Sequence, residues 1–262
     1  MKILIVGDTC TDVFIYGDIL RLSPEAPIPV FNPLREDSND GMAKNVLNNV
    51  EALKVDVFSV TNKNSIRKVR YVDTKSNQLV LRVDEHDYCD RIEKELLELI
   101  RGNKYRPPLS GEIEIDAIII SDYCKGFLEK EDIQYICENN KNVFIDTKKK
   151  LGKWIKDADY IKINELEYKK NHELLSENGF EDKLIVTLGS KGCRYKDKVF
   201  NVKEVPVKDV SGAGDTFIAG LVRGYLDTNN IERAIEFAQK CTTHVVQKHG
   251  VATVTLKEIE NG

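Results

Sequence analysis

Short continuous runs of apolar, β-forming residues recur along the whole chain, and this feature constrains the fold more than any other. Runs of this kind are typical of parallel strands that are buried on both faces. Helical patterns lie between the runs. The alternation predicts an α/β fold, a doubly wound and mostly parallel sheet with helices on both faces. The expected strands are residues 2–7, 55–60, 115–121, 142–146, 160–163 and 183–187.

Apolar residues at helical spacing predict the helices between these strands. Asp90 is placed to cap a helix whose apolar face carries Ile92, Leu96, Leu99 and Ile100. A second helix is expected over 129–138 and a long final helix over 231–246.

Two segments interrupt this rhythm. The first, 12–35, contains four prolines and an extended stretch at 28–31. The second, 67–84, alternates apolar and polar residues around the turn Lys75-Ser76-Asn77, which is typical of a hairpin. Together they predict a small antiparallel β flap, a lid of about 12–36 and 66–85, attached to a single domain that covers 1–262.

Composition narrows the classes of partner. The net charge is −4, whereas proteins that bind nucleic acid carry a basic surplus, so no nucleic acid is expected. No apolar run approaches the roughly 20 residues that span a bilayer, and the first run is too short for a secretory signal, so no membrane is expected either. Six scattered cysteines without a Cys-x-x-Cys pair indicate a reducing, cytoplasmic location and no structural metal site.

The segment Ser211-Gly212-Ala213-Gly214-Asp215 carries the sharpest chemical signal. It leads into a helical pattern, and the free N–H groups of a first helical turn form an anion site together with the helix dipole. Gly212 and Gly214 let the backbone approach a phosphate, and Asp215 is placed to take a proton from an incoming hydroxyl. We expect the dipole to lower the pKa of Asp215. Glycine-rich loops also precede helices that bind nothing, so a purely structural role stays open.

The segment 212–217 resembles the signature of the ribokinase-like (PfkB) carbohydrate kinases, and further motifs of that family follow in the same order. Asn164-Glu165-Leu166-Glu167 is similar to a motif that helps to hold Mg²⁺ through water, and 187–192 resembles the nucleotide-side turn. The residues alone allow a purely structural alternative, in which Asn164 is an N-cap and Glu167 is an acid in the first turn of the helix. The resemblance implies ATP and Mg²⁺ as cofactors, Asp215 as the base, Gly212, Ala213 and Gly214 around the transferred phosphate, and Asn164, Glu167, Thr187, Gly189 and Gly192 on the nucleotide side.

The amino-terminal half resembles the sugar side of the same family. Gly7-Asp8 with Asp12 is similar to the opening in which an aspartate binds sugar hydroxyls. The segments 21–30, 68–70, 78–84 and 121–126 resemble one subgroup, the kinases that phosphorylate the anomeric hydroxyl of D-glycero-D-manno-heptose 7-phosphate in ADP-heptose and lipopolysaccharide precursor synthesis. The substrate-binding residues that follow from these likenesses are Asp12, Gly41, Asn45, Lys68, Arg70 and Lys125.

Elementary geometry agrees with a phosphorylated substrate. Lys68 and Arg70 are two residues apart on an expected strand, so both side chains leave the same face. Two cations on one face of a flap suit a sugar phosphate better than a neutral sugar, although a solvated charged face is the alternative. Lys125 is open to the same surface interpretation. The family likeness also implies a homodimer through the flap and, if the chain is complete, a separate protein for the nucleotidyl-transfer step.

The chain departs from the family pattern in two places. Asp40 stands where the family has the first of two glycines. Only six residues separate Val60 from Arg67, where relatives carry roughly a helix and a strand more.

Three functions therefore stay open: a kinase for heptose 7-phosphate, a ribokinase-like kinase for another sugar, sugar phosphate or nucleoside, and a non-catalytic binder of sugar phosphate or nucleotide.

Overall fold

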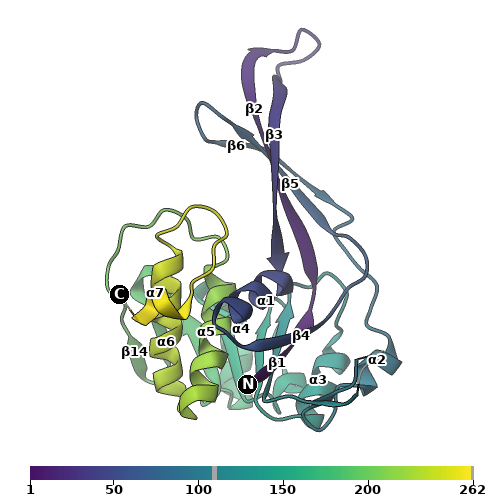
Figure 1. Ribbon diagram of the computed structural model, residues 1–262, viewed down its shortest axis with the longest axis vertical. Helices are drawn as coiled ribbons and strands as arrows, with labels where there is room; N and C mark the ends of the chain where they lie inside the picture. Colours follow the sequence, from purple (N-terminus) through teal and green to yellow (C-terminus); the bar gives the residue numbers. More distant parts are fainter. Residues whose placement is uncertain (108–110, 261–262) are drawn as a thin grey trace.

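An eight-stranded sheet forms the body of the protein (Figure 1), which a computed structural model describes over residues 1–107 and 111–260, without the side chains of 172–174 and 176–178. Six neighbouring strands are parallel. At one edge two further strands follow, each of which pairs antiparallel with the strand before it. In spatial order the strands are β14 (Lys198–Phe200), β13 (Cys193–Tyr195), β12 (Leu184–Thr187), β11 (Tyr160–Asn164), β10 (Val143–Thr147), β9 (Ala117–Asp122), β1 (Lys2–Gly7) and β4 (Asp56–Thr61).

All six expected strands are present, and none of their bounds differs from the prediction by more than two residues. Helices cover both faces of the sheet, which confirms the doubly wound prediction. One face packs on α1 (Ala43–Ala52), α5 (Ala213–Thr228) and α6 (Ile231–Val245). The other packs on α2 (Lys94–Glu98), α3 (Lys130–Asn139) and α4 (Glu165–Asn178).

Two helix predictions were wrong. The helix that Asp90 was expected to cap is only the five-residue α2, whose N-cap is Glu93. The N–H groups of Cys89 and Ile92 instead donate to the carbonyls of Lys125 and Phe127, so this stretch is held by backbone pairing to the loop after β9. In addition, α6 is not the final helix, because α7 (Leu256–Glu260) follows it.

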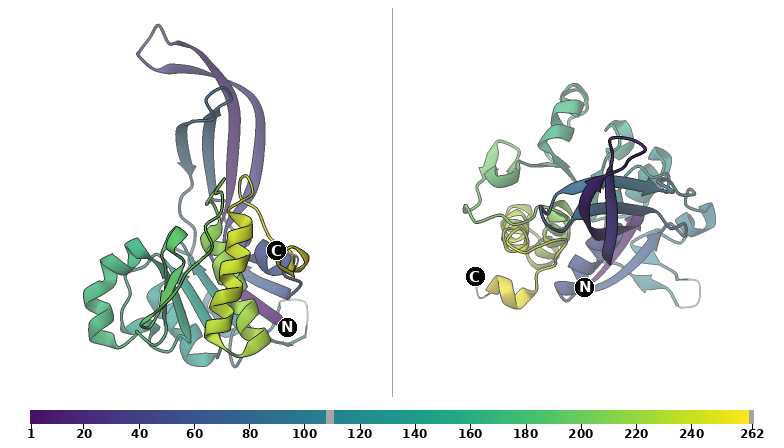
Figure 2. Two further views of the ribbon diagram at one scale, coloured as in Figure 1. Left: turned by 90° about the vertical axis from the view of Figure 1, so that its left-hand side faces the viewer. Right: turned by 90° about the horizontal axis from the view of Figure 1, so that it is seen from above.

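A second sheet of four strands rises from one end of the body (Figures 1 and 2). Its order is β3 (Pro29–Met42), β2 (Thr9–Leu22), β5 (Arg67–Asp73) and β6 (Leu79–Glu85). The outer pairs are antiparallel, as expected of the flap, and the central pair β2–β5 is parallel. A short two-stranded ladder of β7 (Lys104–Tyr105) and β8 (Ile113–Glu114) completes the strands in the described residues. None of the helices within these ranges has the length and hydrophobicity to cross a bilayer.

The short link between the two sheets lies where the chain departs from the family pattern. β4 is the outermost strand on its side of the body, and only residues 62–66 connect it to β5 in the flap. The Asn62 side chain accepts from the N–H of Thr9 at 2.6 Å, and the carbonyl of Ile66 accepts from that of Thr11 at 2.8 Å. The link is thus bonded directly to the base of β2.

Candidate active site

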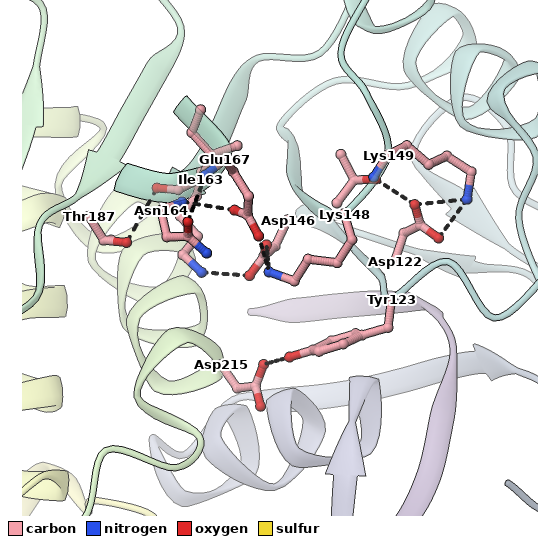
Figure 3. Close-up of polar contacts among 12 residues, drawn as sticks. Asp122, Tyr123, Asp146, Lys148, Lys149, Ile163, Asn164, Glu167, Thr187 and Asp215 are labelled. Atoms are coloured by element: carbon pink, nitrogen blue, oxygen red, sulfur yellow. Dashed lines mark hydrogen bonds and ion pairs between the residues drawn. The ribbon is translucent and has the colours of Figure 1, made fainter. Parts of the chain in front are cut away.

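Asp215 lies in the first turn of α5, opposite the carboxyl ends of β9, β10 and β11. Its side chain is buried, and both carboxylate oxygens accept hydrogen bonds. The hydroxyl of Tyr123 donates to Oδ1 at 2.6 Å (Figure 3), and Nδ2 of Asn45 donates to Oδ2 at 2.7 Å. Asn45, which is expected to hold a sugar hydroxyl, thus also contacts Asp215.

The expected direction of the Asp215 pKa was wrong. Burial raises the pKa of Asp215 above its ordinary value of 3.8, and the nearby charge of Asp146 raises it further. The hydrogen bonds from Tyr123 and Asn45 lower it, but they do not outweigh the burial. Desolvation of a carboxylate exceeds the helix dipole here, since dipole effects amount to about 0.3–1 kcal/mol. A raised pKa makes Asp215 a better proton acceptor than the sequence suggested.

The turn before α5 has the conformation that its glycines permit. Gly212 has φ = 77°, and a Cβ there would lie 2.7 Å from Nδ2 of Asn45. A Cβ on Gly214 would lie 3.0 Å from the ammonium of Lys162. Of the three expected anion-binding N–H groups, that of Ala213 donates to the carbonyl of Val210 at 3.2 Å. The first turn otherwise presents N–H groups that lack an intrahelical partner.

A buried charge network lies beneath this turn, and its central member, Lys162, was not predicted as a site residue. Lys162, in β11, is only 4% exposed, and its ammonium is 2.6 Å from Asp146. Lys148 lies 3.4 Å from the same carboxylate and 2.7 Å from Glu167 (Figure 3). Burial opposes ionisation of Asp146, but Lys162 and Lys148 outweigh it and lower its pKa. One signal was available: Lys162 interrupts an otherwise apolar strand between two isoleucines.

Asn164 and Glu167 form a capping box at the start of α4. The N–H of Glu167 donates to the Asn164 side chain, and the N–H of Asn164 donates to the Glu167 carboxylate, each at 2.9 Å. The described residues contain no group of three or more His, Cys, Asp or Glu side chains suited to a metal. Mg²⁺ keeps several waters and takes most of its ligands from phosphates, so a single carboxylate reached through water fits that ion.

A cavity of about 1080 Å³ lies between the flap and the body. Lys68 and Arg70 both line it from β5, which confirms that they share a face. Arg82 faces them from β6, where it is paired in register with Arg70 and holds Asp84 through two hydrogen bonds. Arg82 was not among the expected site residues. Asp12 lines the same cavity from β2, and its carboxylate is 2.6 Å from the guanidinium of Arg70.

Gly41 is needed where β3 passes Asp12. A Cβ on Gly41 would lie 2.4 Å from the Asp12 carboxylate and 2.6 Å from the sulfur of Cys10. Asp40, which replaces the first of the two glycines of the family pattern, pairs with Lys44 in the first turn of α1 at 2.7 Å. Lys125 is the expected substrate residue that the structure does not bring to the cavity. Its ammonium lies 2.5 Å from Asp87, outside the lining residues.

A second cavity, of about 480 Å³ and lined mainly by apolar side chains, lies on the other side of the turn before α5. Thr187, Gly189 and Gly192 line it, so three of the five residues expected on the nucleotide side are brought together here, while Asn164 and Glu167 are outside its lining. Gly192 has φ = 88°, and a Cβ there would lie 1.9 Å from the carbonyl oxygen of Phe200. The apolar wall of the cavity was not predicted from the sequence; it includes Val205, Val207, Val210, Phe217 and Val246.

Solved structures establish the class of fold. Ribokinase from Thermotoga maritima superposes with a TM-score of 0.73 at 17% identity, covering 99% of this chain and 98% of that one. Arabidopsis thaliana ribokinase, solved with ribose and ATP, gives 0.69 at 15% identity, covering 99% and 97%. The fold is therefore ribokinase-like.

The family follows from the sequence comparison. Residues 43–258 match the model of the pfkB family carbohydrate kinases, and the chain belongs to this family of sugar kinases. The resemblance found in the motifs is thereby confirmed.

Curated relatives named "Bifunctional protein HldE" match nearly all of the chain. One of them, from Helicobacter pylori strain J99, is 32% identical over 303 positions, covering 98% of this chain and 65% of that protein. The one from Nitratiruptor sp. is 31% identical over 297 positions, covering 99% and 64%. The chain thus spans less than two thirds of these relatives. Both alignments are longer than its 262 residues, so these relatives carry segments that the chain lacks within the aligned region.

Proposed function

We propose that the chain is an ATP-dependent kinase that phosphorylates the anomeric hydroxyl of D-glycero-D-manno-heptose 7-phosphate. One observation carries the proposal: Asp215 and Gly212 line both the cation-bearing flap cavity and a third cavity, of about 550 Å³, at the carboxyl ends of β10 and β11. A sugar phosphate in the first cavity and a nucleotide that reaches the other would therefore meet at Asp215.

The reaction asks the protein mainly to align its substrates and to stabilise charge. Asp215 accepts the proton of the anomeric hydroxyl while that oxygen forms a bond to the terminal phosphorus of ATP. The bond from this phosphorus to its bridging oxygen breaks, and ADP leaves with the electron pair. N–H groups of Gly212 and Gly214 donate to the transferred phosphoryl oxygens, and the ammonium of Lys162 beneath them adds positive charge.

On the nucleotide side, the apolar cavity beside Thr187, Gly189 and Gly192 suits the base of ATP. Asn164 and Glu167 would hold Mg²⁺ through water, and the ion would neutralise charge on the phosphates. The Ala213 N–H takes part in the turn that shapes the phosphate site, given its bond to Val210.

On the sugar side, Lys68, Arg70 and Arg82 supply the cations that a phosphate at the far end of the substrate requires. Asp12 faces the sugar hydroxyls, and Gly41 leaves room for its carboxylate. The likeness of the flap segments to heptose 7-phosphate kinases and the similarity to proteins named HldE favour this substrate. Lys125, which lies outside the lining residues, would act on the substrate only after releasing Asp87.

A coupled assay of ADP release across sugars and sugar phosphates, heptose 7-phosphate included, tests the proposal. We expect ADP release to depend on the phosphorylated heptose. Charge reversal at Lys68 and Arg70 should abolish most of the affinity for a phosphorylated substrate and spare that for a neutral sugar. Arg21→Glu is the matched control, because Arg21 is an exposed flap residue outside the cavity lining. ADP release that responds only to an unphosphorylated sugar or a nucleoside would contradict the proposal.

We further propose that the flap is a lid and that two copies of the chain pair through it. Large hydrophobic side chains on the described surface are concentrated on the flap, where Leu20, Leu22 and Leu34 are each more than 60% exposed, and Leu79 and Leu81 more than half. A second copy of the chain would cover this apolar surface. The net charge of −4 gives no reason to expect an anionic partner there instead. Light scattering should show a dimer that Leu34→Lys with Leu81→Lys dissociates. A wild-type monomer at micromolar concentration would contradict the pairing.

A further inference from the structure

Tyr123 is a side chain at the site for which neither the motifs nor the family match supplies a role. It directly follows β9, and its hydroxyl lies 2.6 Å from Oδ1 of Asp215 (Figure 3). Burial raises the pKa of Tyr123 well above its ordinary value, and the charge of Asp215 raises it further. The hydroxyl therefore keeps its proton and acts as the donor. Tyr123 also lines both cavities that meet at Asp215.

The loop that carries Tyr123 is wound around a buried carboxylate. Asp8, 1% exposed at the end of β1, accepts from the N–H groups of Tyr123 at 2.6 Å, Phe127 at 3.3 Å and Lys125 at 3.4 Å. The two residues between these donors, Cys124 and Gly126, have positive φ angles of 58° and 105°. This alternation of backbone conformation turns the three N–H groups to the same side. The arrangement is a backbone nest, here filled by a side chain of the same protein.

The Tyr123 ring itself also contacts a cation. The ammonium of Lys148 lies 5.5 Å from the ring centroid and is itself anchored on Glu167 and Asp146. The ring is thus fixed between the loop, the charge network and Asp215.

We propose that Tyr123 is a positioning residue for Asp215, and that Asp8 acts on the reaction through Tyr123 by fixing the loop. The inference rests on the proposed role of Asp215 as the base. Tyr123 on Oδ1 and Asn45 on Oδ2 together fix the orientation of the carboxylate, and each oxygen keeps a further lone pair with which to accept a proton. The other titratable groups that act on Asp215 are Asp146 from β10, Lys162 from β11 and Cys10 from β2.

Tyr123→Phe is the sharpest variant, because it keeps the ring and removes only the hydroxyl. We expect kcat to fall by about 10- to 100-fold, the usual effect of one hydrogen bond to a charged group, with KM for ATP unchanged. The bond lowers the pKa of Asp215, so its loss should move the acidic limb of the pH profile to higher pH. Tyr105→Phe, which removes the hydroxyl of another buried tyrosine in the remote β7, is the control and should leave both unchanged.

Asp8→Asn tests the second half of the proposal. The amide places N–H donors against backbone N–H donors, so the loop should loosen and kcat should fall with the same pH shift. Because Asp8 acts through Tyr123, the double variant Asp8→Asn with Tyr123→Phe should have a kcat no lower than that of the poorer single variant. Multiplying losses would overturn the role of Asp8.

A titration of the Asp215 carboxyl carbon by ¹³C NMR in the protein alone separates this inference from the proposed function. We expect a higher Asp215 pKa in Tyr123→Phe than in the wild type. An unchanged pKa with kcat within about twofold of wild type would overturn the role of Tyr123. If the wild type turned over no sugar phosphate, the proposed function would fail, while the carboxyl titration would still decide whether Tyr123 tunes Asp215.

Discussion

The guanidinium of Arg70 lies 2.6 Å from the carboxylate of Asp12, across the parallel pair of β2 and β5 in the flap. Both side chains are more than three quarters buried. In this arrangement the proposed ligand of the substrate phosphate and the proposed ligand of the sugar hydroxyls neutralise each other. A sugar phosphate offers a new partner to each group, whereas free phosphate competes only for Arg70.

Asp12→Asn should therefore have opposite effects on two ligands. We expect KM for the sugar phosphate to rise about tenfold, since one hydrogen bond to a charged group is lost. Inorganic phosphate should inhibit more strongly, because Arg70 no longer has a competing carboxylate. Steady-state kinetics with phosphate as inhibitor measures both, and Asp18→Asn on the same strand, outside the cavity lining, is the control. Weaker inhibition by phosphate would contradict this account of the ion pair.

Gly41→Ala tests whether the flap must leave room for Asp12. The added Cβ would lie 2.4 Å from the carboxylate, so Asp12 or the strand must shift. We expect KM for the sugar substrate to rise at least tenfold with little change in KM for ATP, measured by varying each substrate in turn. Gly111→Ala meets nothing within 4 Å and should behave as wild type.

Asp215→Asn should reduce turnover by about 10²–10⁴-fold, the range for loss of a positioned base. ATP binding, measured by calorimetry, should stay near wild type, because the turn around Gly212 is unchanged. Asp227→Asn, at the exposed end of the same helix, is the control. Retained turnover would remove Asp215 from its proposed role.

The raised pKa of Asp215 predicts the shape of the pH profile. The base works when it is ionised, so kcat/KM should fall as the pH drops through the raised pKa of Asp215, at a higher pH than an ordinary aspartate at 3.8 would allow. Rates measured in constant-ionic-strength buffers test this. An acidic limb centred at or below 3.8 would contradict either the raised pKa of Asp215 or its role as the base.

Lys162→Met should be costly to stability, because it leaves Asp146 buried without its closest cation. The expected loss is about 3–5 kcal/mol, reduced to the extent that Lys148 compensates. The double variant Lys162→Met with Asp146→Asn should recover most of the stability, measured by urea unfolding, and none of the turnover. Recovery of turnover would mean that Lys162 serves the fold alone.

The body of the fold was predictable because its parallel strands are buried on both faces and so appear as continuous apolar runs. β13 and β14 were not predicted, since three residues each are too few for a pattern. The parallel pairing of β2 with β5 was missed for another reason: alternation within a strand does not say which strand lies beside it.

Which residues line the candidate site was predictable where glycine and charge carry a local signal, as at Gly212, Gly214 and Lys68. Contacts between distant segments were not. Asn45 was expected on the sugar and does line the flap cavity, but its hydrogen bond to Asp215, 170 positions away, was not predicted. The pKa of Asp215 was misjudged for the same reason, because the helix dipole is local, whereas burial depends on how β9, α1 and α5 come together.

We propose that phosphoryl transfer takes place at the turn before α5, beside Asp215. A crystal structure with a non-hydrolysable ATP analogue and Mg²⁺ tests it most directly. We predict the terminal phosphorus over the N–H groups of Gly212 and Gly214, with the base of the nucleotide in the apolar cavity beside Gly189. A terminal phosphate bound away from this turn would contradict the account.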